Sequence, residues 1–474
     1  MLEGLNVDII SFNNLGKDNN IFRLDAEFFS KECEHLNKII MQRPHFFLRG
    51  DEVVSGPFGS SLRSESYLDK GIPFIRIENI KGGFFINKQE LIYISEKDNE
   101  RLSNSQLRTN DIILSKVGNS IGYFARVDET IKECNISENN IGIKMERYTD
   151  VAKHFILTYL NTTVANKLVL RRRSGNAQPK LNVNDLTFIP IPLIDNVIQT
   201  YTSNLVLKSA FLAEKSVACY KECQEELLSI IGFDENMVSC PIGYQSTFAI
   251  MNQYGRLDAE YYQPLYEKLF CLLKESETAK LGDVVSMQKS IEPGSDYYMA
   301  EGVPFVRVAD LTKFGITEPS IYLDKEIFKD VIRPKQDTIL MSKDGSIGIA
   351  YKVEKDENFI TSGAILHLQI INENILPDYL TLVLNSKIVQ LQAERDAGGS
   401  IIQHWKPSEI SNVVIPILPM EKQQEISQKV QESFRLRNES KRLLNVAKTA
   451  VEIAIGESEE AALEYLKENY DVKL

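Results

Sequence analysis

Short apolar runs rich in β-branched and aromatic residues alternate with turn-forming residues along most of the chain. In the first half the runs are PFIRI at 73–77, DIILS at 111–115 and GYFARV at 122–127. In the second half they are PFVRV at 304–308, DTILM at 337–341 and GIAYKV at 348–353. Glycine, asparagine and aspartate bound these runs, which is typical of short strands joined by turns. The pattern predicts compact, β-rich units with a few helices.

Two long stretches follow a different pattern. Residues 196–231 and 420–455 contain no proline, and apolar side chains recur in them at steps of three and four residues. At ~1.5 Å per residue, each stretch would form a helix of about 55 Å. Because one helix with a single apolar stripe is unstable in water, we expect the two to pair antiparallel. Four basic residues interrupt the stripe, and we expect their charged ends to reach solvent at the edge of the seam: Lys208, Lys215, Arg437 and Lys441.

The two halves of the chain repeat one another. Four blocks recur in the same order, displaced by 224 to 233 residues. They are 23–29 and 256–262, 71–81 and 302–313, 110–127 and 336–353 (aligned without a gap), and 175–193 and 399–417. This order indicates a tandem duplication, so the chain reads as domain, helix, domain, helix. With antiparallel helices such a chain has an approximate two-fold axis, which matches the local two-fold symmetry of duplex DNA.

The segments between the matching blocks differ in the two halves. Residues 56–67 stand where the second half has 290–298, and 174–180 are answered by 398–404. Unequal loops on equal scaffolds would read two different half-sites through base edges and phosphates. The alternative is that these loops are ordinary solvated turns. The candidate DNA-contacting residues are Ser60, Ser61, Arg63, Lys116, Asn119, Arg171, Arg172, Arg173, Asn176, Gln178, Lys180, Lys289, Lys343, Ser346, Ser400, Gln403, His404 and Lys406.

The charge of individual segments supports a DNA-binding role, although the net charge of the whole chain does not. The 474 residues are 43% hydrophobic and 25% charged, with a formal net charge of -12, which by itself argues against a polyanionic partner. Residues 151–200 nevertheless hold six basic and two acidic residues, including the run Arg171 to Arg173, which we interpret as a phosphate contact. Residues 401–450 hold eight basic and five acidic residues, whereas the last 24 residues hold two basic and seven acidic. We expect the chain alone to hold DNA weakly.

Candidate chemistry is sparse. The sequence contains no phosphate loop, nucleophile elbow, dinucleotide fingerprint or HExxH motif. Six scattered cysteines form no CxxC pair, and no metal site is predicted. The start of the sequence lacks a signal-peptide pattern, and no apolar run is long enough to span a bilayer. We therefore expect a soluble, cytoplasmic, non-catalytic protein without a membrane partner.

A set of sequence blocks occurs in the same order in both halves of the chain. The blocks are RLDAE-aromatic-aromatic, GIPFIRI, the D-IIL strand pair with SIG, G-x-x-Q, IPIP and a long helix. Together they resemble the specificity subunit of type I restriction-modification enzymes, over essentially the whole chain to about residue 456. The resemblance implies a mixed α/β (α+β) chain with target-recognition domains at 1–195 and 236–418, spacer helices at 196–235 and 419–456, and an acidic tail at 457–474.

The resemblance also implies a function and partners. The two domains would read an asymmetric bipartite sequence in double-stranded DNA, and the paired helices would act as a ruler. Two adenine methyltransferase (modification) subunits and the restriction/translocase subunits would dock on this chain in a prokaryotic cytoplasm. No cofactor is expected on the chain itself; S-adenosylmethionine, ATP and Mg would be bound by the partner subunits.

The sequence departs from the family pattern at one point, and it leaves two alternative functions open. The second half has Asp344 and Glu292 where the first half has Gly118 and a neutral loop, so we expect sparser DNA contacts there. The acidic net charge also fits a protein-binding scaffold or decoy that keeps the fold without reading DNA. A self-sufficient nuclease or methyltransferase would show turnover by the isolated chain.

Overall fold

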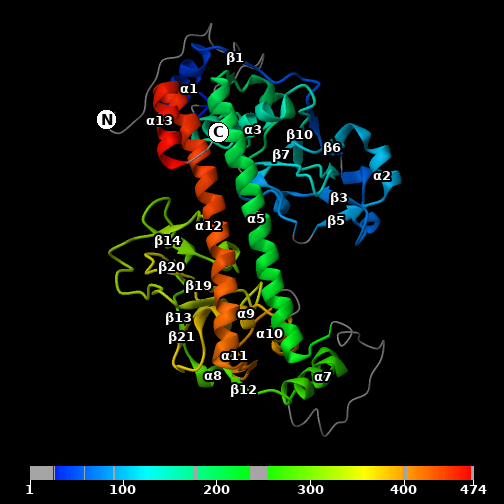
Figure 1. The fold of residues 1–474 in the computed structure, drawn as a ribbon, viewed down its shortest axis with the longest axis vertical. Helices are drawn as coiled ribbons and strands as arrows, with labels where there is room; N and C mark the ends of the chain where they lie inside the picture. Colours follow the sequence, from blue (N-terminus) through cyan, green and yellow to red (C-terminus); the bar gives the residue numbers. More distant parts are fainter. Residues whose placement is uncertain are drawn as a thin grey trace. The chain divides into compact units, whose positions relative to one another are not determined.

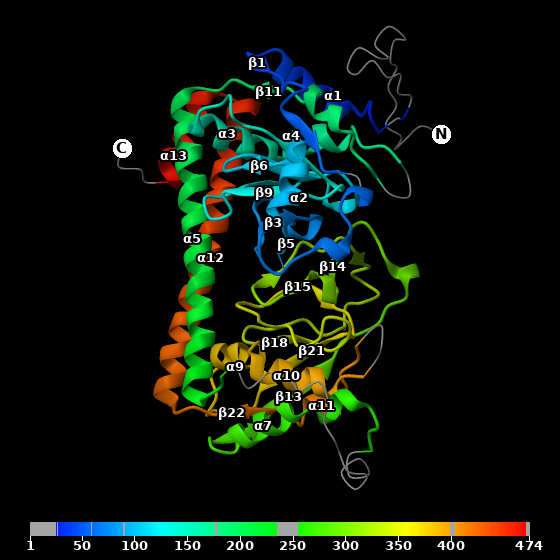
Figure 2. The same ribbon diagram turned by 90° about the vertical axis from the view of Figure 1, so that its right-hand side faces the viewer.

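The computed structural model describes residues 25, 27–57, 59–88, 91–175, 179–234, 255–398 and 403–470. The chain divides into two compact units, each made of discontinuous sequence. Unit 1 contains the residues up to Ala213 together with those from Asn438 onward, and unit 2 comprises Glu214–Arg437. Each unit therefore contains one half of each long helix, and Figures 1 and 2 show its elements in two views.

The sheets of unit 1 are built from short strands. One sheet has the order β2-β10-β7-β8-β4, a second has the order β5-β3-β9-β6, and β1 pairs with β11. The strands are β1 His45–Phe46, β2 Val53–Ser55, β3 Ile72–Ile75, β4 Phe84–Phe85, β5 Ile92–Ile94, β6 Leu107–Arg108, β7 Ile112–Ser115, β8 Phe124–Arg126, β9 Glu133–Ile136, β10 Asn140–Ile143 and β11 Ile191–Pro192. The helices are α1 Lys31–Met41, α2 Glu96–Arg101, α3 Asp150–Leu160, α4 Thr163–Leu170 and α13 Glu459–Asn469.

Unit 2 repeats this topology. Its sheet β13-β21-β18-β19 corresponds to β2-β10-β7-β8, and β17-β14-β20 corresponds to β5-β3-β9, with β3/β9 and β14/β20 both parallel pairs. The strands are β12 Thr278–Lys280, β13 Val285–Lys289, β14 Val303–Val306, β15 Leu311–Thr312, β16 Gly315–Ile316, β17 Tyr322–Leu323, β18 Ile339–Ser342, β19 Ala350–Lys352, β20 Ile360–Thr361, β21 Ile365–Ile370 and β22 Val414–Pro416. The helices are α7 Pro264–Leu273, α8 Leu281–Val284, α9 Pro377–Leu384, α10 Lys387–Asp396 and α11 Pro407–Ile410. The predicted fold class and duplication are confirmed.

The gapless alignment of 110–127 with 336–353 is wrong by one residue. The Lys116 amide bonds the Asn139 carbonyl, and the Lys343 amide bonds the Ala364 carbonyl, so Lys116 is the equivalent of Lys343. The loop Gly-Asn-Ser-Ile-Gly at 118–122 is therefore one residue longer than Gly-Ser-Ile-Gly at 345–348. Asp344 consequently corresponds to Val117 and not to Gly118. The shared Ser-Ile-Gly sequence concealed this insertion.

The two predicted long helices are α5, Asn196–Ile231, and α12, Met420–Gly456. In unit 1 the hydroxyls of Ser209 and Ser440 lie 2.7 Å apart, and in unit 2 those of Ser216 and Ser433 lie 3.2 Å apart. The numbers rise along one helix as they fall along the other, so the pairing is antiparallel, as expected. The hydroxyls of Ser209, Ser440 and Ser433 also donate to the backbone of the opposite helix. Because serine is small and makes these bonds, the helices approach closely at these positions.

The expected acidic tail is part of unit 1. Ser458 caps the N-terminus of α13, where Glu459 and Glu460 stand in the first turn and are favoured by the helix dipole. Ala462 and Leu466, four residues apart, are fully buried in the core of unit 1. The carboxylate of Glu459 also accepts a hydrogen bond from the Asp195 amide, just before α5. Residues 459–469 are therefore a packed helix, which their high charge concealed.

Candidate nucleic-acid interface

The loop at 174–180 returns beside the turn that follows β7. Ser174 and Lys180 exchange two backbone hydrogen bonds of 2.8 Å, and the Gly118 amide donates to the Pro179 carbonyl at 2.9 Å. These bonds bring the predicted contacts Lys116 and Lys180 together. Burial lowers the pKa of Lys116, and the charge of Lys180 lowers it further, although Glu138 opposes this. The structure thus concentrates positive charge at this edge of unit 1.

The loop at 56–67 reaches the same region from the other side. Lys116 Nζ donates to Ser55 Oγ at 3.0 Å, immediately before Gly56. A Cβ on Gly56 would lie 1.9 Å from the Ser137 carbonyl oxygen, so only glycine permits this close approach. The following turn, Gly59–Ser61, is a 3-10 helix, and Arg63 after it is exposed. The predicted contacts Ser61 and Arg63 therefore stand on a loop anchored beside Lys116.

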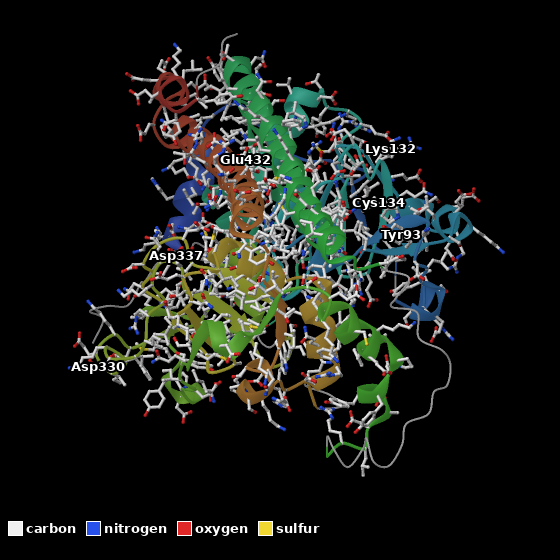
Figure 3. The ribbon with its side chains drawn as sticks, turned by 60° about the horizontal axis from the view of Figure 1, so that its bottom comes forward. Tyr93, Lys132, Cys134, Asp330, Asp337 and Glu432 are labelled. Atoms are coloured by element: carbon white, nitrogen blue, oxygen red, sulfur yellow. The ribbon has the colours of Figure 1, made fainter. Side chains whose placement is uncertain are left out.

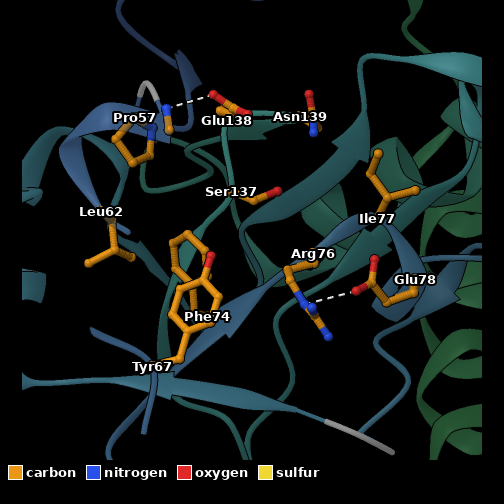
Figure 4. Close-up of a pocket in the computed structure, with 11 residues that line it drawn as sticks. Pro57, Leu62, Tyr67, Phe74, Arg76, Ile77, Glu78, Ser137, Glu138 and Asn139 are labelled. Carbon is orange, nitrogen blue, oxygen red and sulfur yellow. Dashed lines mark hydrogen bonds and ion pairs between the residues drawn. The ribbon is translucent and has the colours of Figure 1, made fainter. Parts of the chain in front are cut away.

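A pocket of about 200 Å³ opens under this loop, and Figure 4 shows the side chains that line it. On one wall the rings of Tyr67 and Phe74 have centroids 5.8 Å apart. On the other, Arg76 Nε forms a 2.8 Å ion pair with Glu78. Unit 2 repeats the aromatic pair with Tyr298 and Phe305, at 5.7 Å. The pair is therefore part of the common scaffold.

Glu138 is a site residue that the sequence reasoning missed. It lies between β9 and β10, and its carboxylate accepts a 2.6 Å hydrogen bond from the Gly59 amide. It thereby fixes the turn that carries the serine candidates and adds a negative charge near Lys116. The repeat comparison offered no signal for it, because residues 128–146 lie outside the matching blocks.

In unit 2 the equivalent loops meet in the same way. Gly398 and His404 exchange backbone hydrogen bonds, and the Gly345 amide donates to the Gln403 carbonyl at 2.9 Å. The Trp405 amide bonds the Lys343 carbonyl, and the Trp405 ring is buried in the core, which anchors the end of the loop. Lys343, Gln403 and His404 are therefore brought together, and the exposed Ser346 stands on the neighbouring turn.

Asp344 neutralises part of this site. Its carboxylate forms an ion pair with Lys343 Nζ and accepts a hydrogen bond from His404 Nδ1 at 2.9 Å. Burial alone would raise the pKa of Asp344, but the hydrogen bonds and charges of Lys343 and His404 outweigh it and lower this pKa. Two of the predicted basic contacts are thus bound to an acid within the chain.

The other two lysines of unit 2 lie at the edges of the site. Lys289, the last residue of β13, is exposed, and its Cε would lie 2.7 Å from a Cβ on Gly363. Lys406 is exposed and forms a 3.4 Å ion pair with Glu409. Of the remaining candidates, Asn176, Gln178 and Ser400 lie outside the described residues, and nothing is described of the side chains of Ser60 and Asn119.

The prediction that Arg171 to Arg173 contact phosphate needs a correction, because two of these three side chains point inward. Arg171 and Arg172 are 5% and 2% exposed. Arg171 Nη1 forms a 2.8 Å ion pair with Glu34, and its guanidinium lies over the ring of Phe28. Arg172 lies over the ring of Phe188. Phosphate contact does not fit these two residues, and Arg173, which is exposed with Glu27 at 3.9 Å, remains a candidate.

None of the helices in the described part of the chain is long and apolar enough to cross a membrane. Among the same residues, no three His, Cys, Asp or Glu side chains are grouped so that they could hold a metal ion.

The chain is similar to one family model and to solved structures of other proteins. Residues 274–446 match the family model described as "Type I restriction modification DNA specificity domain". The chain is similar to the type I restriction-modification S subunit from M. genitalium, with 14% identity over 89% of this chain and 94% of that one, and a TM-score of 0.36. It is also similar to the HsdS subunit from Thermoanaerobacter tengcongensis, with 15% identity over 88% and 98%, and a TM-score of 0.27. No curated protein sequence matches it.

Proposed function

We propose that this chain, whose residues 274–446 match the family model described as "Type I restriction modification DNA specificity domain", reads a bipartite DNA sequence with one half-site per unit. The observation that carries the proposal is the match of residues 274–446, most of which lie in unit 2, combined with the repetition of the sheet topology of unit 2 in unit 1. A duplicated reader suits duplex DNA because the duplex presents equivalent grooves and backbones to both copies.

The loops at corresponding edges of the two units support unequal half-sites. In unit 1 the edge carries Lys116 and Lys180, whereas in unit 2 it carries Lys343 and His404 paired with Asp344. Different donors and acceptors at equivalent positions would contact different base edges. The target would therefore be asymmetric, with this edge of unit 2 making weaker contacts with phosphates than the corresponding edge of unit 1.

The catalytic steps would belong to partner subunits. Two adenine methyltransferase subunits, binding S-adenosylmethionine, and restriction/translocase subunits, using ATP and Mg, would assemble on this chain. The paired helices α5 and α12 would set the number of unread base pairs between the half-sites. In this arrangement the chain supplies recognition and no chemistry.

Replacing Asp344 with asparagine is expected to strengthen DNA binding. The change frees Lys343 and His404 from a carboxylate, so one more phosphate can be neutralised at this edge. We expect an affinity gain of about tenfold on any duplex, the equivalent of ~1.4 kcal/mol. The slope of log K against log salt concentration should become steeper by about one. Fluorescence anisotropy over a series of salt concentrations measures both.

A matched control is Asp356→Asn. It makes the same charge change on an acid of unit 2 that pairs with Lys335, which is not a predicted contact. If both variants gain affinity equally, the effect is one of net charge alone, and the assignment of the Asp344 site is contradicted.

Purification of the tagged chain from its native host tests the proposed function. A methyltransferase should copurify, and the complex should bind duplex DNA more tightly than the isolated chain at equal salt, with affinity falling as salt rises. Partner proteins that copurify without any binding to DNA would instead identify a protein-binding scaffold or decoy.

A further inference from the structure

Two cations of unit 2 lie on a cluster of aromatic rings outside the recognition loops. Lys313 and Phe314 form the two-residue turn between β15 and β16, and Arg437 lies on α12. The Arg437 guanidinium is 4.0 Å from the centroid of the Phe314 ring. Lys313 Nζ is 5.3 Å from the centroids of both Phe314 and Tyr220. The rings of Tyr220 and Phe314 contact each other at 5.0 Å and so hold the turn against α5.

These two cations have no counter-ion in the described part of the chain. None of its carboxylates forms an ion pair with Lys313 or Arg437, whereas the nearby Arg435 is bidentate to Glu432, labelled in Figure 3. Burial lowers the pKa of Arg437, and burial together with the charge of Arg437 lowers that of Lys313. Both side chains are only half-buried, so an anion can reach them.

The aromatic faces offset only part of the free-energy cost of holding two positive charges in a partly buried site. A cation over an aromatic face gains about 0.5–2 kcal/mol, whereas two like charges brought together in a partly dry site repel one another. A bound oxyanion would satisfy both cations at once, with Arg437 presenting a planar fork of donors and Lys313 a point charge.

The first half of the chain lacks this pair. The equivalence of Ser209 with Ser433, which both face the partner helix, aligns Arg437 with Ala213. The equivalence of Asn79 with Asp310, which make the same cap, aligns Lys313 and Phe314 with Gly82 and Gly83. Neither charge nor ring is therefore repeated, although the surrounding scaffold is.

We propose that Lys313 and Arg437 form a binding site for one phosphate group, and that its source is a backbone phosphate of duplex DNA. The inference rests on the proposed function for the source of the phosphate. A carboxylate of a partner protein suits the asymmetry less well, because a partner that docks as two identical copies would need equivalent residues in both halves. An asymmetric DNA target imposes no such requirement.

The test compares the wild-type full chain with the double variant K313Q/R437Q and with R435Q, a matched arginine on the same helix that is already paired with Glu432. Two probes are used. The first is a random-sequence DNA duplex, whose affinity is followed as salt is raised. The second is inorganic phosphate against chloride at equal ionic strength, read as the shift in Tm that a bound anion produces.

We expect the double variant to lose affinity uniformly across sequences and its salt slope to fall by about one, because one phosphate contact is removed. The rise in Tm with inorganic phosphate should disappear in the same variant, while R435Q should behave as wild type. Wild-type affinity and slope in K313Q/R437Q would overturn the DNA source and leave the proposed function standing. If loss of a copurifying protein accompanies that result, the anion is a protein carboxylate and the proposal fails.

Failure of the wild type to bind any duplex would contradict the proposed function and the DNA source together. The phosphate measurement then still decides the site: a Tm shift that K313Q/R437Q abolishes supports an oxyanion site, and a shift that survives in the variant rejects it. The R435Q control separates either result from a general effect of removing a positive charge from α12.

Discussion

Replacing Arg171 or Arg172 with alanine is expected to destabilise unit 1 by about 2–4 kcal/mol. Arg171 is buried between the Phe28 ring and the Glu34 carboxylate, and Arg172 covers the Phe188 ring. Either truncation removes the packing of one guanidinium group, and that of Arg171 also leaves Glu34, which is 40% exposed, without this ion pair. Thermal unfolding followed by circular dichroism measures the loss as a lower Tm.

Arg173 provides the contrast within the same run. It is exposed, and its contact with Glu27 is 3.9 Å, so Arg173→Ala should change the free energy of unfolding by at most about 0.5 kcal/mol. If Arg171→Ala kept the wild-type Tm and lost DNA affinity, the inward placement of the run would be contradicted, and phosphate contact would again be the better interpretation.

Mild acid is expected to destabilise both units through one buried histidine in each. His154 Nδ1 lies 2.8 Å from Ser203 Oγ in unit 1, and His367 Nε2 lies 2.8 Å from Thr361 Oγ1 in unit 2. Burial lowers the pKa of each histidine to about 4, and in His154 the charge of Arg126 adds to the effect. Both side chains therefore stay neutral in the folded chain at pH values where they are protonated in the unfolded chain.

The direction of this pH effect on stability follows from the difference in proton uptake between the folded and unfolded chain. An unfolded histidine binds a proton below its ordinary pKa of about 6.5, whereas the folded one does so only near 4. Stability is therefore complete above about pH 6.5 and falls as the pH decreases toward 4, by about 3 kcal/mol for each histidine. The Tm measured across this range should drop steeply in the wild-type chain.

The variants H154Q and H367Q isolate this contribution from that of the carboxylates. Glutamine retains a hydrogen-bonding side chain but does not titrate, so each variant should have a flatter dependence of Tm on pH. His404→Gln is the control, since His404 is exposed. An unchanged pH dependence in both H154Q and H367Q would contradict the burial of neutral histidines.

The sequence predicts this fold well wherever a local pattern determines the structure. The helices α5 and α12 could be predicted because their apolar spacing runs for more than thirty residues without proline. The strands β3, β7 and β8 and their repeats β14, β18 and β19 fall in the predicted runs for the same reason. Duplication supplied an internal comparison that a single domain does not offer.

Tertiary contacts account for the parts that the sequence did not predict. Arg171 follows directly after α4, where an arginine run suggests an exposed basic patch. Its side chain is held inward by the Phe28 ring and the Glu34 carboxylate, which are distant in sequence. Glu138 and the pair of Lys313 with Arg437 depend on contacts between segments that are distant in sequence and meet in space. Such sites become visible only when the backbone is placed.

The structure also shows where the charged residues that make up the net charge lie, which the composition does not. Acidic residues of α13 belong to the packed core helix of unit 1 and not to a free tail. At the proposed interface, Asp344 cancels part of the positive charge of unit 2. A chain with a net charge of -12 can therefore still present local basic edges, although weaker ones than its count of lysines and arginines implies.

The most direct test is the pattern of methylated adenines in the genome of the native host, determined by single-molecule sequencing, with this gene intact and with residues 56–67 and 174–180 replaced. We expect a bipartite methylated motif that depends on this gene, and the replaced loops should alter one half of the motif while the other half and the spacer remain. Absence of any motif dependent on the gene, or a change in both halves at once, would contradict the claim that each unit reads its own half-site.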